Sequence, residues 1–303
     1  MAPQYLPVVI RHRTYGGLDA DSGEEKWKDE AISEDEPFVF SYLAACAFHT
    51  YVFLCTPRAK KALAAMALLL KQKVKICVPI TDENDALRFI EEKFLPLIKQ
   101  EFPMIYIDER MEREGAFGSH PWRNIRNNEY QDLSWCRGFC FSLDAWHVRK
   151  MAAAGAAKDG KTEVFEVWMF LITAIMIHEI GGHIFVSSLM LNRDHTPPNV
   201  KGHVLIHPRN RGHGESGDFM EQVFGGQILT RDGPEKAHGY PGLRLCRIVE
   251  EDQVAQEYNM TITHEKIHAF FEKKATPFAT EKSREWVSLL SPISVPTLKC
   301  WDQ

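Results

Sequence analysis

The chain has 303 residues, of which 45% are apolar and 25% charged, and its formal net charge is −5. This composition is typical of a soluble globular protein with a substantial core, in one large domain or two smaller ones. The acidic balance and the lack of a long basic block argue against nucleic acid as the main partner.

The N-terminal stretch MAPQYLPVVIRHRTYGG lacks the charged, apolar and small-residue regions of a secretory signal. Seven cysteines, an odd number, are scattered along the chain, which favours free thiols in a reducing compartment. Cys136 and Cys140 have three residues between them rather than the two typical of zinc knuckles, so a packed loop is favoured there over a metal site. We therefore expect a cytoplasmic protein.

The chain begins with alternating strand and helix signals. Residues 5–15 predict a strand, and a polar, acidic loop is expected to follow as far as about Pro37. Residues 38–55 are apolar almost all round, which indicates a buried helix or a helix–strand pair. Residues 57–72 open with a proline and continue in strong helix formers, so they predict a helix.

The next segments complete the pattern of the first half. Residues 73–80, KVKICVPI, are β-branched and alternating, which predicts a strand. Residues 81–102 start with capping residues and repeat apolar positions at helical spacing, with a kink expected at Pro96. Residues 104–109 predict another strand. The order of strands and helices indicates a sheet covered by helices.

The second half is dominated by helix signals. Its expected elements are, in chain order, an irregular region at 112–138, a helix end and turn at 151–161, a long apolar helix at 164–191, a short strand at 202–208, a helix at 218–229 ended or bent by Gly225 and Gly226, and a helix at 283–292.

The expected fold class is α+β, with a mixed α/β lobe at 1–150 and a mainly helical lobe at 151–303, either as two lobes or as one continuous domain.

Residues 38–55 and 164–191 are long enough to span a membrane, but both contain polar residues, and charges at the centre of a span are costly. Buried core helices of a protein without a membrane partner are favoured.

The stretch IMIHEIGGHIFV places His178, Glu179 and His183 inside an apolar helix. Burying three ionisable side chains costs on the order of several kcal/mol unless they are paired or bind a metal. Two neutral imidazoles and a carboxylate can bind zinc and leave a position for water. Glu179 would then take a proton from water that the metal acidifies. The competing interpretation is two core histidines bonded to backbone carbonyls, with Glu179 paired to an arginine elsewhere in the chain.

The spacing of the two histidines is unusual for a helix. His178 and His183 stand at i and i+5, about 140° apart on an ideal helix, which is too far for one ion. The helix must therefore contain one extra residue, as a π-type bulge does. Gly181 and Gly182 lie where this irregularity is easiest, because glycine tolerates unusual dihedral angles and leaves room near an ion.

HEIGGH resembles the His-Glu-three-residues-His motif of the dipeptidyl-peptidase III family of zinc peptidases, including the glycine before the second histidine. More broadly it is similar to the gluzincin metallopeptidases. The resemblance covers this hexapeptide and a downstream helix that carries glutamates. It implies a zincin-like half of the chain and a third metal ligand from a glutamate on a later helix.

The stretch RGHGESGDFMEQVFGG offers two candidates for that third ligand. Glu221 lies among apolar residues in a short helix, so its carboxylate is expected to be buried and to need a cation. Glu215 lies among glycines at the expected helix start, where a carboxylate caps the helix without a metal. The sequence favours Glu221, with Glu215 as the alternative, and the other carboxylate then orients a ligand histidine.

Further catalytic candidates lie in AHGYPG, which we expect to be a loop. In gluzincin-like enzymes a histidine or tyrosine often stabilises the oxyanion, and here His238 or Tyr240 could do so.

The leading hypothesis is a zinc hydrolase that cleaves an amide or peptide-like bond, with a peptide or small molecule as its substrate. One alternative is another metal-dependent enzyme of small-molecule metabolism, such as a lyase, a cyclase or an oxygenase that uses Fe2+. The other alternative is a zincin-like binding protein without turnover.

Overall fold

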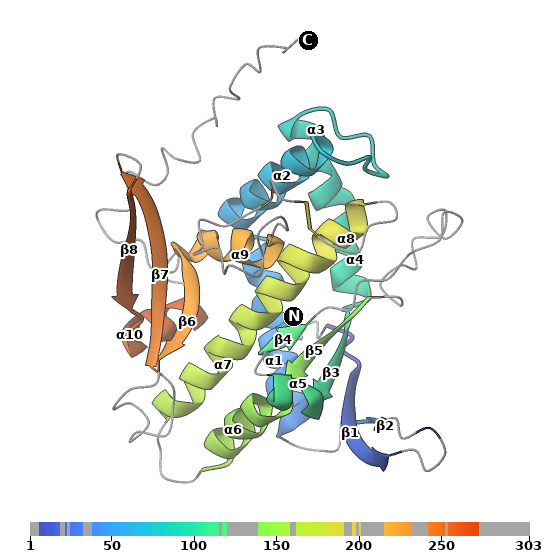
Figure 1. The fold of residues 1–303 in the computed structure, drawn as a ribbon, viewed down its shortest axis with the longest axis vertical. Helices are drawn as coiled ribbons and strands as arrows, with labels where there is room; N and C mark the ends of the chain where they lie inside the picture. Colours follow the sequence, from blue (N-terminus) through green and yellow to red (C-terminus); the bar gives the residue numbers. More distant parts are fainter. Residues whose placement is uncertain are drawn as a thin grey trace.

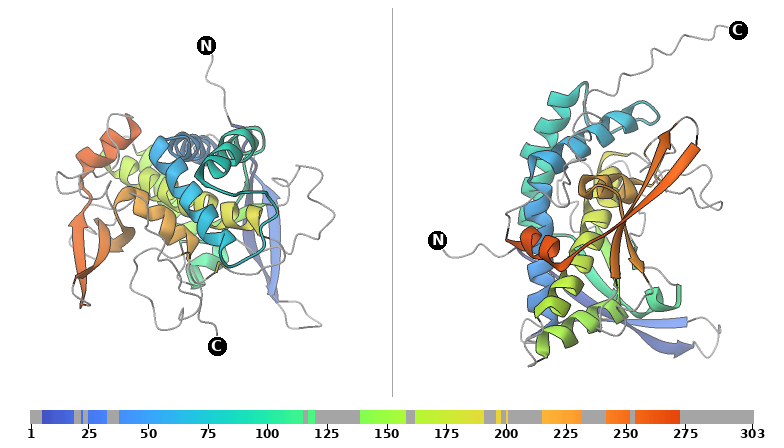
Figure 2. Two further views of the ribbon diagram at one scale, coloured as in Figure 1. Left: turned by 90° about the horizontal axis from the view of Figure 1, so that it is seen from above. Right: turned by 90° about the vertical axis from the view of Figure 1, so that its left-hand side faces the viewer.

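The computed structural model describes residues 6–18, 22, 25–32, 38–114, 117–119, 139–157, 162–190, 196–197, 200, 215–231, 242–251 and 254–272. The fold is α+β, as expected. It contains two sheets: in Figure 1 the three-stranded sheet lies to the left of the central helices and the five-stranded sheet to their lower right, and in the right-hand view of Figure 2 both sheets lie on the same side of the long helices.

The first sheet has the strand order β2-β1-β3-β5-β4. Its strands are β1 (Ile10–Leu18), β2 (Glu25–Ala31), β3 (Met104–Asp108), β4 (Gly118–Ser119) and β5 (Cys140–Asp144). β1, β3 and β5 run parallel, while β2 and β4 are antiparallel to their neighbours. The predicted strands at 5–15 and 104–109 are therefore confirmed, with β1 beginning later than expected.

β2 lies in the segment that the sequence predicted to be a loop, and that prediction was wrong. The strand is polar because it forms an edge of the sheet, where its side chains face solvent. Its register with β1 is supported by a two-pronged ion pair, in which Arg13 donates to Asp29 at 2.8 Å and 3.2 Å. β5 was also missed: all five of its residues are buried, and Cys140, from the expected packed loop, is its first residue.

The predicted helices of the first half are confirmed. They are α1 (Val39–Leu54), α2 (Pro57–Lys71), α3 (Glu83–Phe89) and α4 (Leu95–Gln100), with a π-helical segment at Ile90–Phe94 between the last two. Thr56 caps α2 by accepting a hydrogen bond from the backbone of Ala59 at 3.2 Å. Pro96 lies in the first turn of α4, directly after the π-helical segment, so the helix departs from α geometry close to where the kink was expected.

The predicted strand at 73–80 does not form. Ile76 makes only an isolated bridge to Met190, and the backbone N–H of Cys77 donates to the carbonyl of Leu189 at 2.9 Å. The segment is extended at that point, as its alternating pattern suggested, but it pairs with the end of a helix rather than with a strand.

The central helix of the molecule runs from Thr162 to Leu189 as α7 (Thr162–Ile177), a π-helical segment (His178–Ile184) and α8 (Phe185–Leu189). Every residue from 167 to 177 is buried. Its length and composition would suit a membrane span, but it is mostly buried inside the protein, as the core helix of a soluble protein is. The predicted long apolar helix is confirmed. α5 (Glu109–Glu114) and α6 (Ala145–Ala156) precede it, and Asp144 caps α6 through the N–H of His147 at 3.2 Å.

The second half also contains a sheet that the sequence did not predict. This antiparallel sheet has the order β6-β7-β8, with β6 (Gln227–Arg231), β7 (Gly242–Glu251) and β8 (Val254–Thr261). α9 (Ser216–Glu221) and a short 3-10 turn precede β6, and α10 (His264–Phe271) follows β8. The predicted helix end at Gly225 is confirmed, because this glycine has a left-handed φ of 105°. The predicted elements at 202–208 and 283–292 lie outside the described residues.

Buried apolar residues from both halves of the chain form one hydrophobic cluster. Phe53 of α1 stacks on Phe224 after α9, with ring centroids 4.7 Å apart, and Phe270 of α10 meets Phe170 of α7 edge-to-face at 5.3 Å. These contacts hold α9 and α10 against the central helix.

Candidate metal centre

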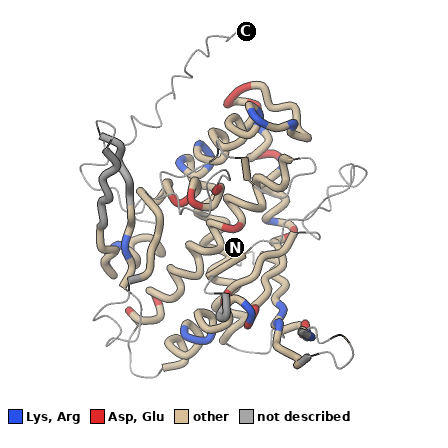
Figure 3. Tube along the Cα trace, in the orientation of Figure 1, with Lys and Arg blue, Asp and Glu red and all other residues tan. Residues whose placement is uncertain are grey.

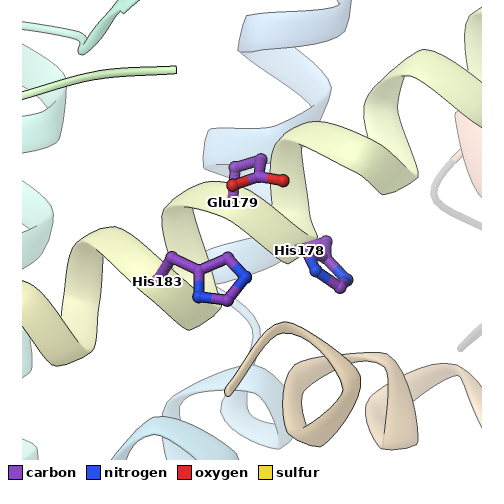
Figure 4. Close-up of side chains that lie close together, drawn as sticks. All are labelled: His178, Glu179 and His183. Carbon is purple, nitrogen blue, oxygen red and sulfur yellow. The ribbon is translucent and has the colours of Figure 1, made fainter. Parts of the chain in front are cut away.

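The two histidines of HEIGGH lie in a π-helical segment, as their spacing predicted. The extra residue in this turn brings both imidazoles to one side of the helix, where they face α9 (Figure 4). Their ring centroids are 5.1 Å apart. The i, i+5 spacing is therefore compatible with one shared site.

The glycines on the two helices permit a very close crossing. A Cβ atom at Gly182 would lie 2.5 Å from both the Cα and the N of Gly217, so α9 passes directly over the central helix. A Cβ at Gly217 would lie 2.1 Å from Nε2 of His178. Among the described residues positive φ occurs only at Gly17, Gly225 and Gly226, so Gly181 and Gly182 do not use unusual dihedral angles. The expected use of unusual dihedral angles was therefore wrong, and Gly182 instead provides room for α9.

Glu215, at the start of α9, faces both histidines. Its Oε1 lies 3.0 Å from Nε2 of His183 and 3.8 Å from Nε2 of His178. The same oxygen accepts a hydrogen bond from the backbone N–H of Gly217 at 3.0 Å, so the residue also caps the helix, as expected. Glu215 thus contacts both imidazoles at the crossing of the two helices.

Glu221, at the end of α9, contacts Nδ1 of His178, whereas Glu215 faces Nε2 of the same ring. Its Oε1 lies 2.7 Å from Nδ1 of His178, and its Oε2 accepts a hydrogen bond from the backbone N–H of Ile228 at 2.7 Å. Both oxygens therefore have partners although the residue is buried. His178, Asp218 and Glu221 can also bring one donor atom each within 4.8 Å of one another, which forms a second possible grouping around the same histidine.

Nδ1 of His183 also has a partner, which the sequence reasoning missed. Oγ of Ser216 lies 3.2 Å from this nitrogen, and Oγ1 of Thr196 lies 3.0 Å from Oγ of Ser216. All three side chains are buried or nearly so. The position of Ser216 next to Glu215 was the available signal, because a residue beside a ligand at a helix start can reach the same site.

Glu179 is buried with one oxygen lacking a partner. Its side chain is 3% exposed, and Oε2 has no hydrogen-bond partner in the described part of the chain. A Cβ at Gly118 of β4 would lie 3.0 Å from Oε1, so the edge strand of the first sheet passes close to this carboxylate. His178, Glu179 and His183 can each bring one donor atom within 4.8 Å of the other two.

The charges at the crossing influence one another strongly. Burial disfavours the charged form of His178, but the hydrogen bond and charge of Glu221 and the charges of Glu179 and Glu215 outweigh it and raise the pKa to about 10. Burial likewise opposes ionisation of Glu215, yet its contact with His183 lowers the pKa to about 2. Burial raises the pKa of Glu179.

The excess of carboxylates is local. Acidic positions gather along α9 beside the middle of the central helix (Figure 3). Burial raises the pKa of Asp218 to about 7, with further contributions from Glu221 and Glu215, and its Oδ1 accepts a hydrogen bond from Gln227 at 3.0 Å. Such a collection of buried acids and histidines suits a divalent cation.

The two other expected catalytic residues, His238 and Tyr240, lie outside the described residues. Comparison of the chain with protein-family models, with curated proteins and with solved structures finds no match. The function proposed below therefore rests on the geometry of the site.

Proposed function

We propose that the protein is a zinc-dependent hydrolase that cleaves an amide or peptide-like bond. His178, His183 and Glu215 would hold the metal. Two donors bound tetrahedrally at zinc–nitrogen or zinc–oxygen distances of about 2.0–2.1 Å stand about 3.3 Å apart. The separations of 3.0 and 3.8 Å between Glu215 and the two Nε2 atoms lie on either side of that value. Glu215 is thus preferred over Glu221, the residue that the sequence favoured.

Glu221 and Ser216 would orient the two imidazoles. Histidines that bind metals usually engage a carboxylate or another polar group through their second nitrogen, which fixes the ring and its tautomer. Here Glu221 contacts Nδ1 of His178, and Ser216 contacts Nδ1 of His183. The Nε2 atoms of both rings then face Glu215, at 3.8 Å for His178 and 3.0 Å for His183.

Glu179 would act as the general base. The observation that carries the proposal is its buried Oε2 without a partner, beside two histidines that share a carboxylate. A buried acceptor of this kind is costly unless a ligand or water uses it. Zinc, when bound, would lower the pKa of a water molecule, and Glu179 would accept the proton and pass it to the leaving nitrogen.

β4 supports an extended, peptide-like substrate. The backbone N–H of Asp144 donates to the carbonyl of Phe117 at 3.0 Å, so that peptide group faces β5. Because backbone groups alternate along a strand, those of Gly118 face away from β5, while the carboxylate of Glu179 lies against the face of β4 at this residue. A substrate added at this edge by strand addition would lie near Glu179.

A cytoplasmic location and the absence of nucleic-acid and membrane partners belong to the same proposal.

Elemental analysis and a turnover assay test the proposal together. Glu179→Gln should keep its zinc and lose hydrolysis of an amide substrate panel by about 10²–10⁴-fold, because only the proton acceptor is removed. His178→Ala and Glu215→Ala should each lower the zinc content by one per chain. Unchanged hydrolysis in Glu179→Gln would refute the assignment of the base. Iron with oxygen-dependent activity would favour the oxygenase alternative, and zinc without hydrolysis of any amide or ester would favour a binding protein.

A further inference from the structure

A second cluster of histidine and carboxylate side chains lies away from the candidate metal centre. Nε2 of His264 on α10 lies 2.8 Å from Oε2 of Glu166 on α7, and Nδ1 of His268 lies 3.2 Å from both oxygens of the same carboxylate. Glu272 contacts the other nitrogen of His268 at 3.4 Å. One carboxylate therefore lies between two imidazoles from a different helix.

The two histidines stand at a spacing along α10 that allows them to share a ligand. His264 and His268 stand at i and i+4, so they project about 40° apart from the same face of α10. They belong to the segment HEKIH, which has the two-residue spacing of familiar zinc-binding helices. Their ring centroids are 6.1 Å apart, so an ion held beside Glu166 requires the two rings to turn toward each other about their side-chain bonds. Both side chains are partly exposed, which leaves room for this rotation.

The environment of this cluster suits cation binding but not the catalysis proposed for HEIGGH. Glu166 and Glu272 contact the two imidazoles, and Lys266 is the one lysine or arginine within α10 itself. Glu265, the glutamate of HEKIH, is exposed, whereas Glu179 of HEIGGH is buried beside its histidines. A cation held here would be accessible to solvent and would lack the buried base of the first site.

We propose that Glu166, His264 and His268 form a second divalent-cation site, with zinc as the expected ligand, and that the bound ion links α10 to α7. The two helices already pack through Phe270 and Phe170. Ligands from both helices would make the ion an additional connection between them, and binding would stabilise the folded state. This site is independent of the proposed hydrolase activity, because it shares no residue with the first site.

Zinc stoichiometry and thermal melting test the proposal on full-length protein without a histidine tag. Isothermal titration with zinc should give two sites in the wild type and one in the variant His264→Ala/His268→Ala, with the remaining site unchanged. The matched control Glu265→Gln, on the same helix, should keep both sites, because its side chain is exposed. Circular dichroism checks that each variant is folded.

The background variant His178→Ala separates this site from the first. In that variant zinc should still bind at one site and raise the melting temperature, and both effects should vanish when His264→Ala and His268→Ala are added. Equal zinc binding by the wild type and by His264→Ala/His268→Ala would overturn the proposal. If His178→Ala removes all zinc binding, the proposal is also wrong.

Discussion

The substitution Gly217→Ala gives a direct test of the helix crossing that holds the candidate metal centre. The added Cβ would lie 2.1 Å from Nε2 of His178, and 2.2 and 2.3 Å from the ring carbons on either side of it. Ordinary contact begins at 3.4 Å, so the imidazole must retreat from its position facing Glu215. A displacement of about 1 Å at a reactive site can cost on the order of 10²-fold. We therefore expect zinc affinity to fall by about 100-fold or more.

The effect on stability should be smaller than the effect on metal binding. Overpacking costs about 1–3 kcal/mol, and replacing a helical glycine by alanine returns up to about 1 kcal/mol. A melting temperature lowered by a few degrees is therefore expected for the metal-free variant.

Zinc titration calorimetry and thermal melting of Gly217→Ala measure the two effects, with Gly181→Ala as the control. The three atoms nearest to a Cβ at Gly181 belong to the side chains of Leu54 at 3.0 Å and Met220 at 3.1 and 3.3 Å, which can move. Gly181→Ala should therefore keep its zinc affinity. Zinc binding of wild-type strength in Gly217→Ala would refute the assignment of Nε2 of His178 as a ligand atom.

Three further predictions concern the surrounding charges. Glu221→Ala should weaken zinc binding by about 10–100-fold without abolishing it, measured by calorimetry, because it only orients His178. In protein treated with chelator, the contribution of His178 to the free energy of unfolding should be complete below its unfolded pKa of about 6.5. Since the pKa of His178 in the folded state is raised to about 10, this contribution should be lost as the pH rises from about 6.5 to about 10. If urea melts show that the difference in free energy of unfolding between wild type and His178→Ala does not change over this pH range, the prediction is wrong. Asp108→Asn should lower the free energy of unfolding by about 3 kcal/mol at neutral pH, because the buried Asp108 accepts hydrogen bonds from Arg110 at 2.7 Å and Arg13 at 3.3 Å. Burial opposes ionisation of Asp108, but these arginines lower its pKa. Its contribution to the free energy of unfolding is therefore lost only as the pH falls through that lowered pKa. Urea melts should show the free energies of unfolding of the variant and the wild type converging below about pH 4.

The central helix and its irregular turn could be predicted because the physical constraint lay within one segment. Eleven consecutive buried residues from 167 to 177 leave no polar face, which marks a core helix. The i, i+5 spacing of His178 and His183 has no common face on an α-helix, so an extra residue was required. Local geometry sufficed in both cases.

The missed strands depended on partners far away in the chain. β2 is polar because it is an edge strand, and its pairing with β1 decides its conformation. Residues 73–80 have a better strand pattern, yet no strand of the described chain lies beside them to pair with. Strand propensity reflects packing against neighbours, so a single segment does not determine it.

The contacts of the two glutamates explain why we propose Glu215 rather than Glu221, the residue that the sequence favoured, as the third ligand. Glu221 was favoured because a buried carboxylate needs a partner, but His178 and the N–H of Ile228 satisfy both of its oxygens without a metal. Glu215 stands six residues earlier, about 9 Å along an ideal helix axis, on the side where both Nε2 atoms lie. The imidazole of His178 thus lies between the two carboxylates, with one of its nitrogens facing each of them. A graded result, in which Glu215→Ala abolishes zinc binding at this site and Glu221→Ala only weakens it, is what this arrangement requires, and equal effects of the two variants would contradict it.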